Sequence, residues 1–213
     1  MKQKTTFQVV GSCFFVIFLG LGYIVKYHLS LLSGFDQSLT TLIRTTYPNW
    51  NDYQLFMTKF GNPLTVILIF LFVSFLLWWK KKKTELIWFA LNFISVAGII
   101  NPLIKLLIMR ERPTLLHLVS EHSSSFPSGH ATTSMILYGT LLVILPVILQ
   151  KNLLRSLLQL LLAFIIVSVG ISRVYLGVHF PSDIIGGYLL SLSWLFFTYP
   201  LYKRQKEKAV TIP

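Results

Sequence analysis

The sequence has little of what a soluble or disulfide-stabilised domain needs. Only one of its 213 residues is a cysteine, Cys13, so no disulfide can form within the chain, and its place in an apolar run favours a packing role. Charged residues make up 12% of the chain, against roughly 25% in an average soluble protein. No internal repeat or low-complexity linker is present. These absences exclude a disulfide scaffold and a repeat array, and they argue against an ordinary soluble domain.

Acidic residues are also scarce: the chain has seven Asp and Glu, against 19 Lys and Arg. Magnesium sites depend on carboxylates, so the sequence disfavours a metal-dependent mechanism and we expect no cofactor. One metal alternative remains open. His117 and Glu121 lie four residues apart and His122 follows, a spacing that could hold zinc, although segment 114–125 has the composition of a polar loop.

Long apolar runs are what the chain has instead. Hydrophobic residues make up 54% of it, and its mean hydropathy is +0.68. Six segments approach the roughly 20 residues that a membrane-spanning helix needs, namely 7–27, 63–79, 85–108, 131–149, 157–178 and 182–202. We therefore predict one all-α membrane domain over residues 1–213, with six transmembrane helices.

Two segments allow alternatives. The first span also resembles a signal peptide, because lysines precede it and residues 20–22 offer a small-residue cleavage site; the length of its apolar run favours a retained helix. Between the first two spans, apolar residues from Phe35 to Ile43 follow a helical spacing. This pattern predicts an interfacial amphipathic helix over 35–46, which would either connect spans or guide lipid.

Basic residues gather in short clusters between the apolar segments. Twelve of the 19 fall in the stretches 2–4, 80–83, 151–155 and 203–208. Because they are scattered rather than collected on a polar domain, we expect no nucleic-acid partner. With six spans, all four clusters share one side, which the positive-inside rule makes cytoplasmic. Both termini would then be cytoplasmic, and the connections after the third and fifth spans extracytoplasmic.

Three polar islands interrupt the apolar chain near the predicted extracytoplasmic face. They are Lys105 with Arg112-Pro113, then Pro127-Ser128-Gly129-His130, then Ser172-Arg173 with His179 and Asp183. An ionisable group in such a place is costly and is therefore a functional-site candidate. The cations of the islands could bind phosphate oxygens, although each one alone would also fit interfacial snorkelling.

The second and third islands carry distinct chemistry. The second precedes an apolar run and is predicted to begin a helix, whose free N–H groups attract anions. There Ser128 could cap the helix, and Gly129 would let the backbone approach a phosphate. In the third island, His179 precedes Asp183 by four residues, a spacing that places two side chains on one helical face. The carboxylate could hold one ring nitrogen protonated and leave the other as a nucleophile.

Together the islands resemble the three-part signature of the type 2 phosphatidic acid phosphatase superfamily. The matching motifs are Lys105-x6-Arg112-Pro113, Pro127-Ser128-Gly129-His130 and Ser172-Arg173-x5-His179-x3-Asp183. The likeness covers about residues 105–183. It implies a six-helix bundle with an extracytoplasmic active site and a metal-independent hydrolase of lipid phosphate esters or diphosphates.

The resemblance also implies a role for each residue. His179 would attack phosphorus to form a phosphohistidine, Asp183 would orient it, and His130 would protonate the leaving oxygen and later activate water. The phosphoryl oxygens would be held by Lys105, Arg112, Ser128, Gly129 and Arg173. Two substrates compete, phosphatidylglycerophosphate and undecaprenyl diphosphate, and Gly129 favours the phosphatidylglycerophosphatase B type. The alternative is a lipid-phosphate binding or transport protein without turnover, against which the His179 and Asp183 pair argues.

Overall fold

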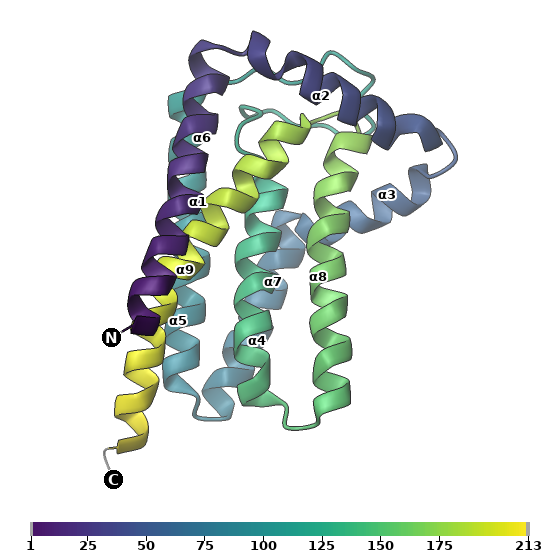
Figure 1. The fold of residues 1–213 in the computed structure, drawn as a ribbon. Helices are drawn as coiled ribbons and strands as arrows, with labels where there is room; N and C mark the ends of the chain where they lie inside the picture. Colours follow the sequence, from purple (N-terminus) through teal and green to yellow (C-terminus); the bar gives the residue numbers. More distant parts are fainter. Residues whose placement is uncertain (1, 212–213) are drawn as a thin grey trace.

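The computed structural model describes residues 2–211, and most of them belong to helices that form an elongated bundle (Figure 1). In chain order, the α-helices of this part are α1 (Lys2–Tyr27), α2 (Ser30–Ile43), α3 (Asn51–Thr58), α4 (Pro63–Trp79), α5 (Lys83–Phe93), α6 (Asn101–Ile108), α7 (Gly129–Ile148), α8 (Asn152–Tyr175) and α9 (Pro181–Thr211). Short 3-10 turns occupy Arg44–Thr46 and Lys59–Gly61, and a π-helical stretch, Ile94–Ile100, joins α5 to α6. The predicted all-α fold class is confirmed.

Five helices among the described residues are long and apolar enough to cross a membrane. They are α1, α5 continued into α6, α7, α8 and α9. A further candidate is α3 with α4, which pass the same test together but are bent by 48°. Asn62, with an extended backbone, separates them, and Pro63 begins α4, where its missing N–H costs no hydrogen bond. The prediction of a polytopic membrane protein is confirmed, with five or six spans.

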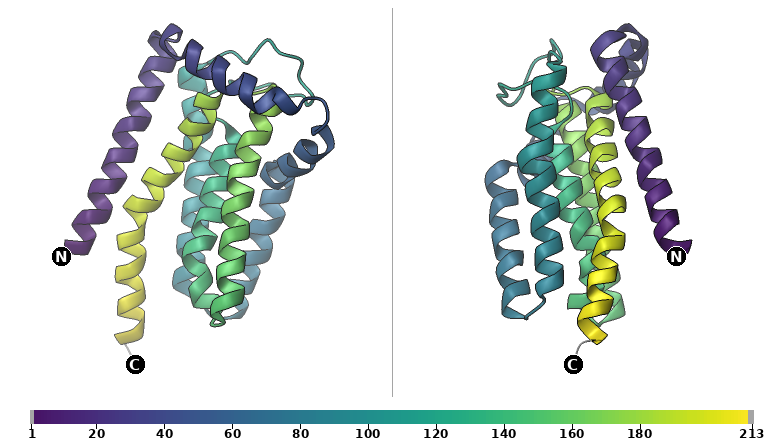
Figure 2. Two further views of the ribbon diagram at one scale, coloured as in Figure 1. Left: turned by 45° about the vertical axis from the view of Figure 1, so that its right-hand side comes forward. Right: turned by 90° about the vertical axis from the view of Figure 1, so that its left-hand side faces the viewer.

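The centre of the bundle is α7, which packs against α5, α8 and α9. Its buried side chains Ile136, Leu137 and Ile144 join Leu77 of α4 and Phe89 of α5 in one apolar core. α1 lies on the outside of the bundle and runs along α9 (Figure 2). This packing fixes the ends of α7, α8 and α9 relative to one another, and those ends carry the polar islands.

The two ends of the bundle differ in what they carry. The α4–α5 and α7–α8 turns lie at the end toward which both chain termini point, whereas α2 and the α6–α7 connection cover the other end (Figure 1). The basic stretches 80–83, 151–155 and 203–208 therefore share one end of the molecule. The three polar islands lie at the opposite end, as the parity of six spans requires.

The helix α2 begins earlier than the interfacial helix predicted over 35–46 and is followed by a 3-10 turn. One of its faces exposes Leu31, Phe35 and Leu42, and the opposite face buries Asp36. The apolar pattern therefore identified the helix but not the polar residue on its inner face.

The π-helical stretch ends two residues before Pro102, the second residue of α6. Proline has no N–H to donate, and its ring clashes with the carbonyl four residues earlier in a regular α-helix, so a widened turn relieves the clash. Ala97 and Gly98 of this stretch form part of the wall of the cavity described next.

Candidate active site

The three islands meet in a cavity of 760 Å³, whose lining includes the N-terminus of α7 and part of the α6–α7 connection. Five of the eight predicted site residues line it, namely Lys105, Arg112, Gly129, His130 and His179. The other three, Ser128, Arg173 and Asp183, are buried directly behind them. The structure therefore brings all eight predicted residues together, although they come from three separate islands of the chain.

The N-terminus of α7 is built as the sequence predicts. Ser128 has an extended backbone and accepts a hydrogen bond from the Ala131 N–H at 3.4 Å, so it caps the helix. A Cβ added at Gly129 would lie 3.9 Å from Lys105 Cε, so a side chain there would extend toward the predicted phosphate-binding lysine. The backbone N–H of Ser128 donates to the Asp183 carbonyl at 3.1 Å, which links the second island to the third.

The turn between α8 and α9 holds His179. Gly177, with a φ of +79°, lets the chain reverse after α8, and the His179 N–H then donates back to the Arg173 carbonyl at 3.3 Å. Asp183 lies in the first turn of α9, and its carboxylate accepts from the Phe180 N–H at 2.9 Å. His179 thus precedes the helix rather than belonging to it, yet its Nδ1 lies 3.3 Å from Asp183 Oδ2.

The hydrogen-bond partners of His179 assign its protonation. Its Nε2 lies 3.3 Å from Nη1 of Arg112, and an arginine can only donate, so Nε2 must carry a lone pair. The proton then sits on Nδ1 and faces Asp183. Burial lowers the pKa of His179 to about 4, against the hydrogen bond and charge of Asp183, which raise it. A neutral imidazole with a lone pair at the cavity is the form that a nucleophile requires.

Glu121 occupies the centre of the predicted anion site. Its carboxylate pairs with Arg173 Nη2, lies 3.5 Å from Arg112 Nη2, and lies 3.9 Å from His130 Nδ1. A carboxylate thus stands among the groups expected to bind a phosphoryl group. In the sequence, the spacing of Glu121 from His117 had indicated only a possible zinc ligand.

The zinc arrangement is not what the structure forms. His117 Nε2 is bonded to the Pro113 carbonyl at 2.8 Å, and Glu121 is engaged by arginines. Within residues 2–211, no three His, Cys, Asp or Glu side chains cluster closely enough to hold a metal ion.

The break between α3 and α4 supplies two partners that the sequence did not reveal. Asn62 Oδ1 lies 2.8 Å from His130 Nε2, and Thr58 Oγ1 accepts from Arg173 Nη1 at 2.7 Å. A Cβ added at Gly61 would lie 2.9 Å from His130 Cδ2, so a glycine is needed there. Because Asn62 takes Nε2, the nitrogen of His130 left for proton exchange is Nδ1.

A second layer of polar residues lies behind His179. Arg110 donates to Asp183 Oδ1 at 2.6 Å and to Asp36 Oδ2 at 2.8 Å, and the Ser125 hydroxyl donates to Asp183 Oδ2. Lys105 donates to the backbone carbonyl of Ser124. The one signal for Arg110 in the sequence is its place two residues before Arg112, within the first island.

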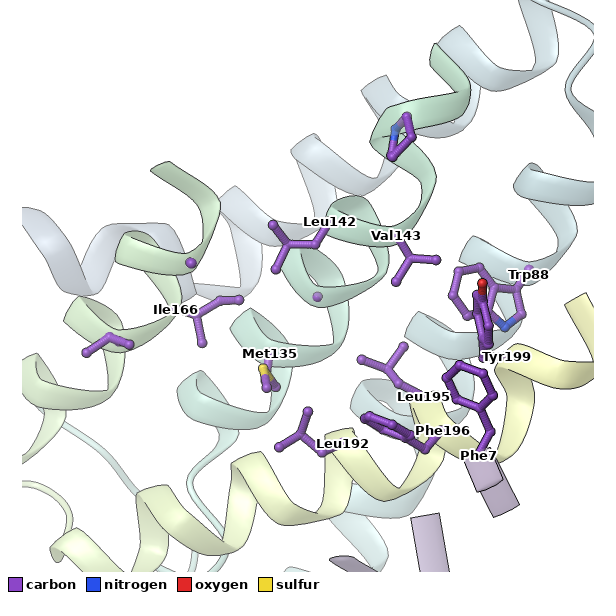
Figure 3. A pocket seen from close by; sticks show the side chains of 14 residues that line it. Phe7, Trp88, Met135, Leu142, Val143, Ile166, Leu192, Leu195, Phe196 and Tyr199 are labelled. Atoms are coloured by element: carbon purple, nitrogen blue, oxygen red, sulfur yellow. The ribbon is translucent and has the colours of Figure 1, made fainter. Parts of the chain in front are cut away.

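A separate cavity of 620 Å³ lies between α7, α8 and α9 (Figure 3). Its walls are apolar and include Trp88, Met135, Leu195 and Phe196. No acid–base pair lines it, so the polar cavity is the candidate active site.

Comparison with known proteins agrees with this geometry. The family model of the PAP2 superfamily matches residues 85–207, more than half of the chain. The chain is 30% identical over 190 residues to phosphatidylglycerophosphatase B of Bacillus subtilis, covering 86% of this chain and 89% of that protein. It is 28% identical over 196 residues to an undecaprenyl-diphosphatase of Sulfolobus acidocaldarius, covering 86% and 88% of the two chains.

Two solved structures share the fold. A crystal structure of a transmembrane PAP2-type phosphatidylglycerolphosphate phosphatase from Bacillus subtilis has a TM-score of 0.77 and 27% identity, covering 95% of this chain and 98% of that one. The structure of Aquifex aeolicus LpxE has a TM-score of 0.55 and 23% identity, covering 76% and 94%, and supports the fold alone.

Proposed function

The chain belongs to the PAP2 superfamily and is a membrane lipid phosphatase, and on this premise we propose that it works without a metal, through a phosphohistidine on His179. The observation that carries this proposal is the arrangement of His179 itself. Its Nδ1 faces Asp183, and its Nε2 lies beside Arg112 at the cavity wall.

The phosphoryl group would bind where Glu121 now lies. Arg173 and Arg112 present guanidinium groups there, Lys105 adds a further positive charge, and Ser128 and Gly129 begin the helix whose N–H groups can bind an anion. These groups would hold the three phosphoryl oxygens as negative charge develops on them, which is the main task in catalysis of phosphoryl transfer.

Two displacements would follow. The Nε2 lone pair of His179 forms a bond to phosphorus as the bond to the leaving oxygen breaks. His130 enters this step as the imidazolium, with its Nε2–H held by Asn62 Oδ1, and gives the leaving oxygen its Nδ1 proton. His130 then takes a proton from water, the water oxygen bonds to phosphorus, and the N–P bond breaks to release inorganic phosphate. Asp183 keeps Nδ1 of His179 as the protonated nitrogen throughout.

The proposed substrates are phosphatidylglycerophosphate and undecaprenyl diphosphate, the compounds after which the two similar enzymes are named. The cavity suits an amphiphile, because apolar residues such as Leu64, Ile67 and Phe93 line it beside its polar wall. We place the active site on the extracytoplasmic face and both termini in the cytoplasm, because the basic stretches lie at the opposite end. Single cysteines in place of Leu118 and Gln205, in a Cys13→Ala background, would test this with an impermeant thiol reagent, which should label only position 118 on intact cells.

The mechanism is tested with purified protein and a panel of detergent-dispersed lipid phosphates. Phosphate release should survive excess chelator, and vanadate should inhibit, because it adopts the five-coordinate geometry of the transition state. Complete loss with chelator, restored by magnesium or zinc, would overturn the metal-independent mechanism. Binding of the same lipids without any phosphate release would favour a carrier.

A further inference from the structure

A cluster of buried charges lies behind the active site and does not line the cavity. It consists of Asp36 from α2, Arg110 from the α6–α7 connection, and Ser182 with Asp183 from the first turn of α9. Asp36 is 3% exposed, Arg110 6% and Asp183 0%. Asp36 and Arg110 come from parts of the chain that are 74 residues apart. Charged groups rarely become so buried without a partner or a task.

We propose that Asp36 and Arg110 are positioning residues of the phosphatase, which fix the orientation of the Asp183 carboxylate and, through it, of the His179 nucleophile. This proposal rests on the proposed function of His179. Neither residue touches the substrate cavity, so both act only through Asp183.

Arg110 sets the rotation of the Asp183 carboxylate. Its Nη1 donates to Oδ1 of Asp183 at 2.6 Å, while Oδ2 accepts from the Ser125 hydroxyl and the Phe180 N–H and faces His179 Nδ1. The two oxygens therefore have separate partners, and a rotation of the carboxylate would break bonds on both sides. The Arg110 guanidinium also lies 4.1 Å from the centre of the Phe180 ring, which holds it from one face.

Asp36 holds Arg110 in turn and fastens the start of α9. Its Oδ2 accepts from Arg110 Nη2 at 2.8 Å and from the Ser182 hydroxyl at 2.8 Å, and its Oδ1 accepts from the Ser182 backbone N–H at 2.9 Å. That N–H belongs to the first turn of α9, where no intrahelical acceptor exists. A carboxylate from another helix thus caps the helix that carries Asp183, next to its positive dipole end.

The positive charge of Arg110 lies between the negative charges of Asp36 and Asp183, and this arrangement keeps Asp183 ionised. Without Arg110, two carboxylates would share a buried space, and such a pair favours protonation of one member. A protonated Asp183 could no longer hold the Nδ1 proton of His179. Without Asp36, Arg110 would keep its bond to Asp183 but lose the acceptor of its Nη2, which fixes the orientation of the guanidinium group.

The test measures kcat, KM and inhibition by inorganic phosphate for Arg110→Met, Arg110→Lys and Asp36→Asn. Arg110→Met should lower kcat about 100-fold and Asp36→Asn about tenfold, as for other residues that orient a catalytic group. KM and the inhibition constant of phosphate should change less than about threefold, because the cavity is intact. Arg110→Lys should recover part of the loss, since it restores a cation.

A double-variant cycle separates positioning from a structural role. If Arg110 acts through Asp183, adding Arg110→Met to Asp183→Asn should cost little more than Asp183→Asn alone. The proposal would be overturned if the double variant lost kcat by the product of the two single losses. It would also be overturned if Arg110→Met changed only KM. If Arg110→Met does not fold, Asp36→Asn in the same cycle gives the same decision.

Glu85→Gln is the matched control, because Glu85 is an equally buried carboxylate, at 4% exposure, bonded to Tyr202 at the other end of the bundle. It should lower the melting temperature without lowering kcat. If it lowers kcat as much as Asp36→Asn does, the proposal is wrong. Full activity in both His179→Ala and Asp183→Asn would instead refute the proposed function itself.

Discussion

Two buried arginines of this protein both pair with carboxylates, but in opposite settings. Arg173 pairs with Glu121, whose side chain is 24% exposed and lines the cavity; we call these two residues the open pair. Arg110 pairs with Asp36 and Asp183, whose side chains are 4% and 0% exposed; we call these three residues the closed cluster. In the proposed mechanism, a substrate phosphate would replace the carboxylate of the open pair, whereas Arg110, Asp36 and Asp183 do not line the cavity.

The difference shows that burial of an arginine does not reveal its task. Removing the partner of a buried charge is costly, and the Glu121 carboxylate supplies that partner for Arg173; in the proposed mechanism, a phosphate would take its place. In the closed cluster, no phosphate replaces the carboxylates. We propose that they fix the orientation of one neighbour, His179. In the proposed mechanism, binding and orientation are divided between these two arginines, of which only Arg173 belongs to the three-part signature.

The largest effect should follow from His179→Ala, which removes the group that the closed cluster serves. Turnover should fall about 10⁴-fold or more, as for other nucleophiles that act as a unit with their partners. Inorganic phosphate should still bind, because Arg112 and Arg173 remain; titration calorimetry measures this directly. His117→Ala is the control, since its ring bonds the Pro113 carbonyl outside the cavity. Substantial turnover by His179→Ala would contradict the assignment of the nucleophile.

The second expected effect belongs to His130, which stands beside the open pair. His130→Ala should lower turnover of an alkyl phosphate by about 10² to 10⁴, the usual range for a general acid. An aryl phosphate should suffer much less, because its leaving oxygen needs no proton. Steady-state rates on both substrates give the ratio. Equal losses on both would show that His130 binds phosphate rather than donating a proton.

The sequence predicts the residues of the polar islands but not the partners that these residues contact. The residues around His179 could be predicted, because each island lies at the end of an apolar run, and the number of spans places the islands on one side. Ser128 was identified as a cap by its position before an apolar segment, and the structure confirms it. Local patterns of this kind need no knowledge of tertiary partners.

The partners of the islands could not be predicted in the same way. Asp36 lies on a helix that its apolar residues revealed, but a polar residue on such a helix is read as solvent-facing. Glu121 and Asn62 lie in a loop and at a helix break, where no periodicity indicates what a side chain contacts. The sequence offers one signal for these partners, which is that the chain has only seven acidic residues. In so apolar a chain, each acidic residue is expected to pair with a basic one.

The acid limb of the pH profile should show a further effect of burial. His179 must be neutral to attack, and burial lowers its pKa to about 4. Protonation of His179 should therefore lower kcat/KM about tenfold per pH unit, and only below about pH 4. Monoester substrates titrate near pH 6 themselves, so two substrates with different phosphate pKa values are compared, and activity is re-measured after return to pH 7. A limb that stays near pH 6.5 with both substrates would mean that His179 is more hydrated than the structure shows.

The smallest effect should come from Glu121→Gln, and it tests the open pair most directly. A phosphate must displace the Glu121 carboxylate from Arg173, and the amide competes less because it carries no charge. Binding of inorganic phosphate should tighten about two- to fivefold, the range for an ion pair with a partly exposed partner. Titration calorimetry on Glu121→Gln and on Glu111→Gln separates this local competition from a general loss of negative charge, because Glu111 is exposed nearby. If both variants bind phosphate more tightly to the same extent, the cause is the overall charge of the protein. If Glu121→Gln binds phosphate more weakly, Glu121 helps to organise the anion site. Asp36→Asn should leave phosphate binding unchanged, because its carboxylate belongs to the closed cluster and has no phosphate to compete with.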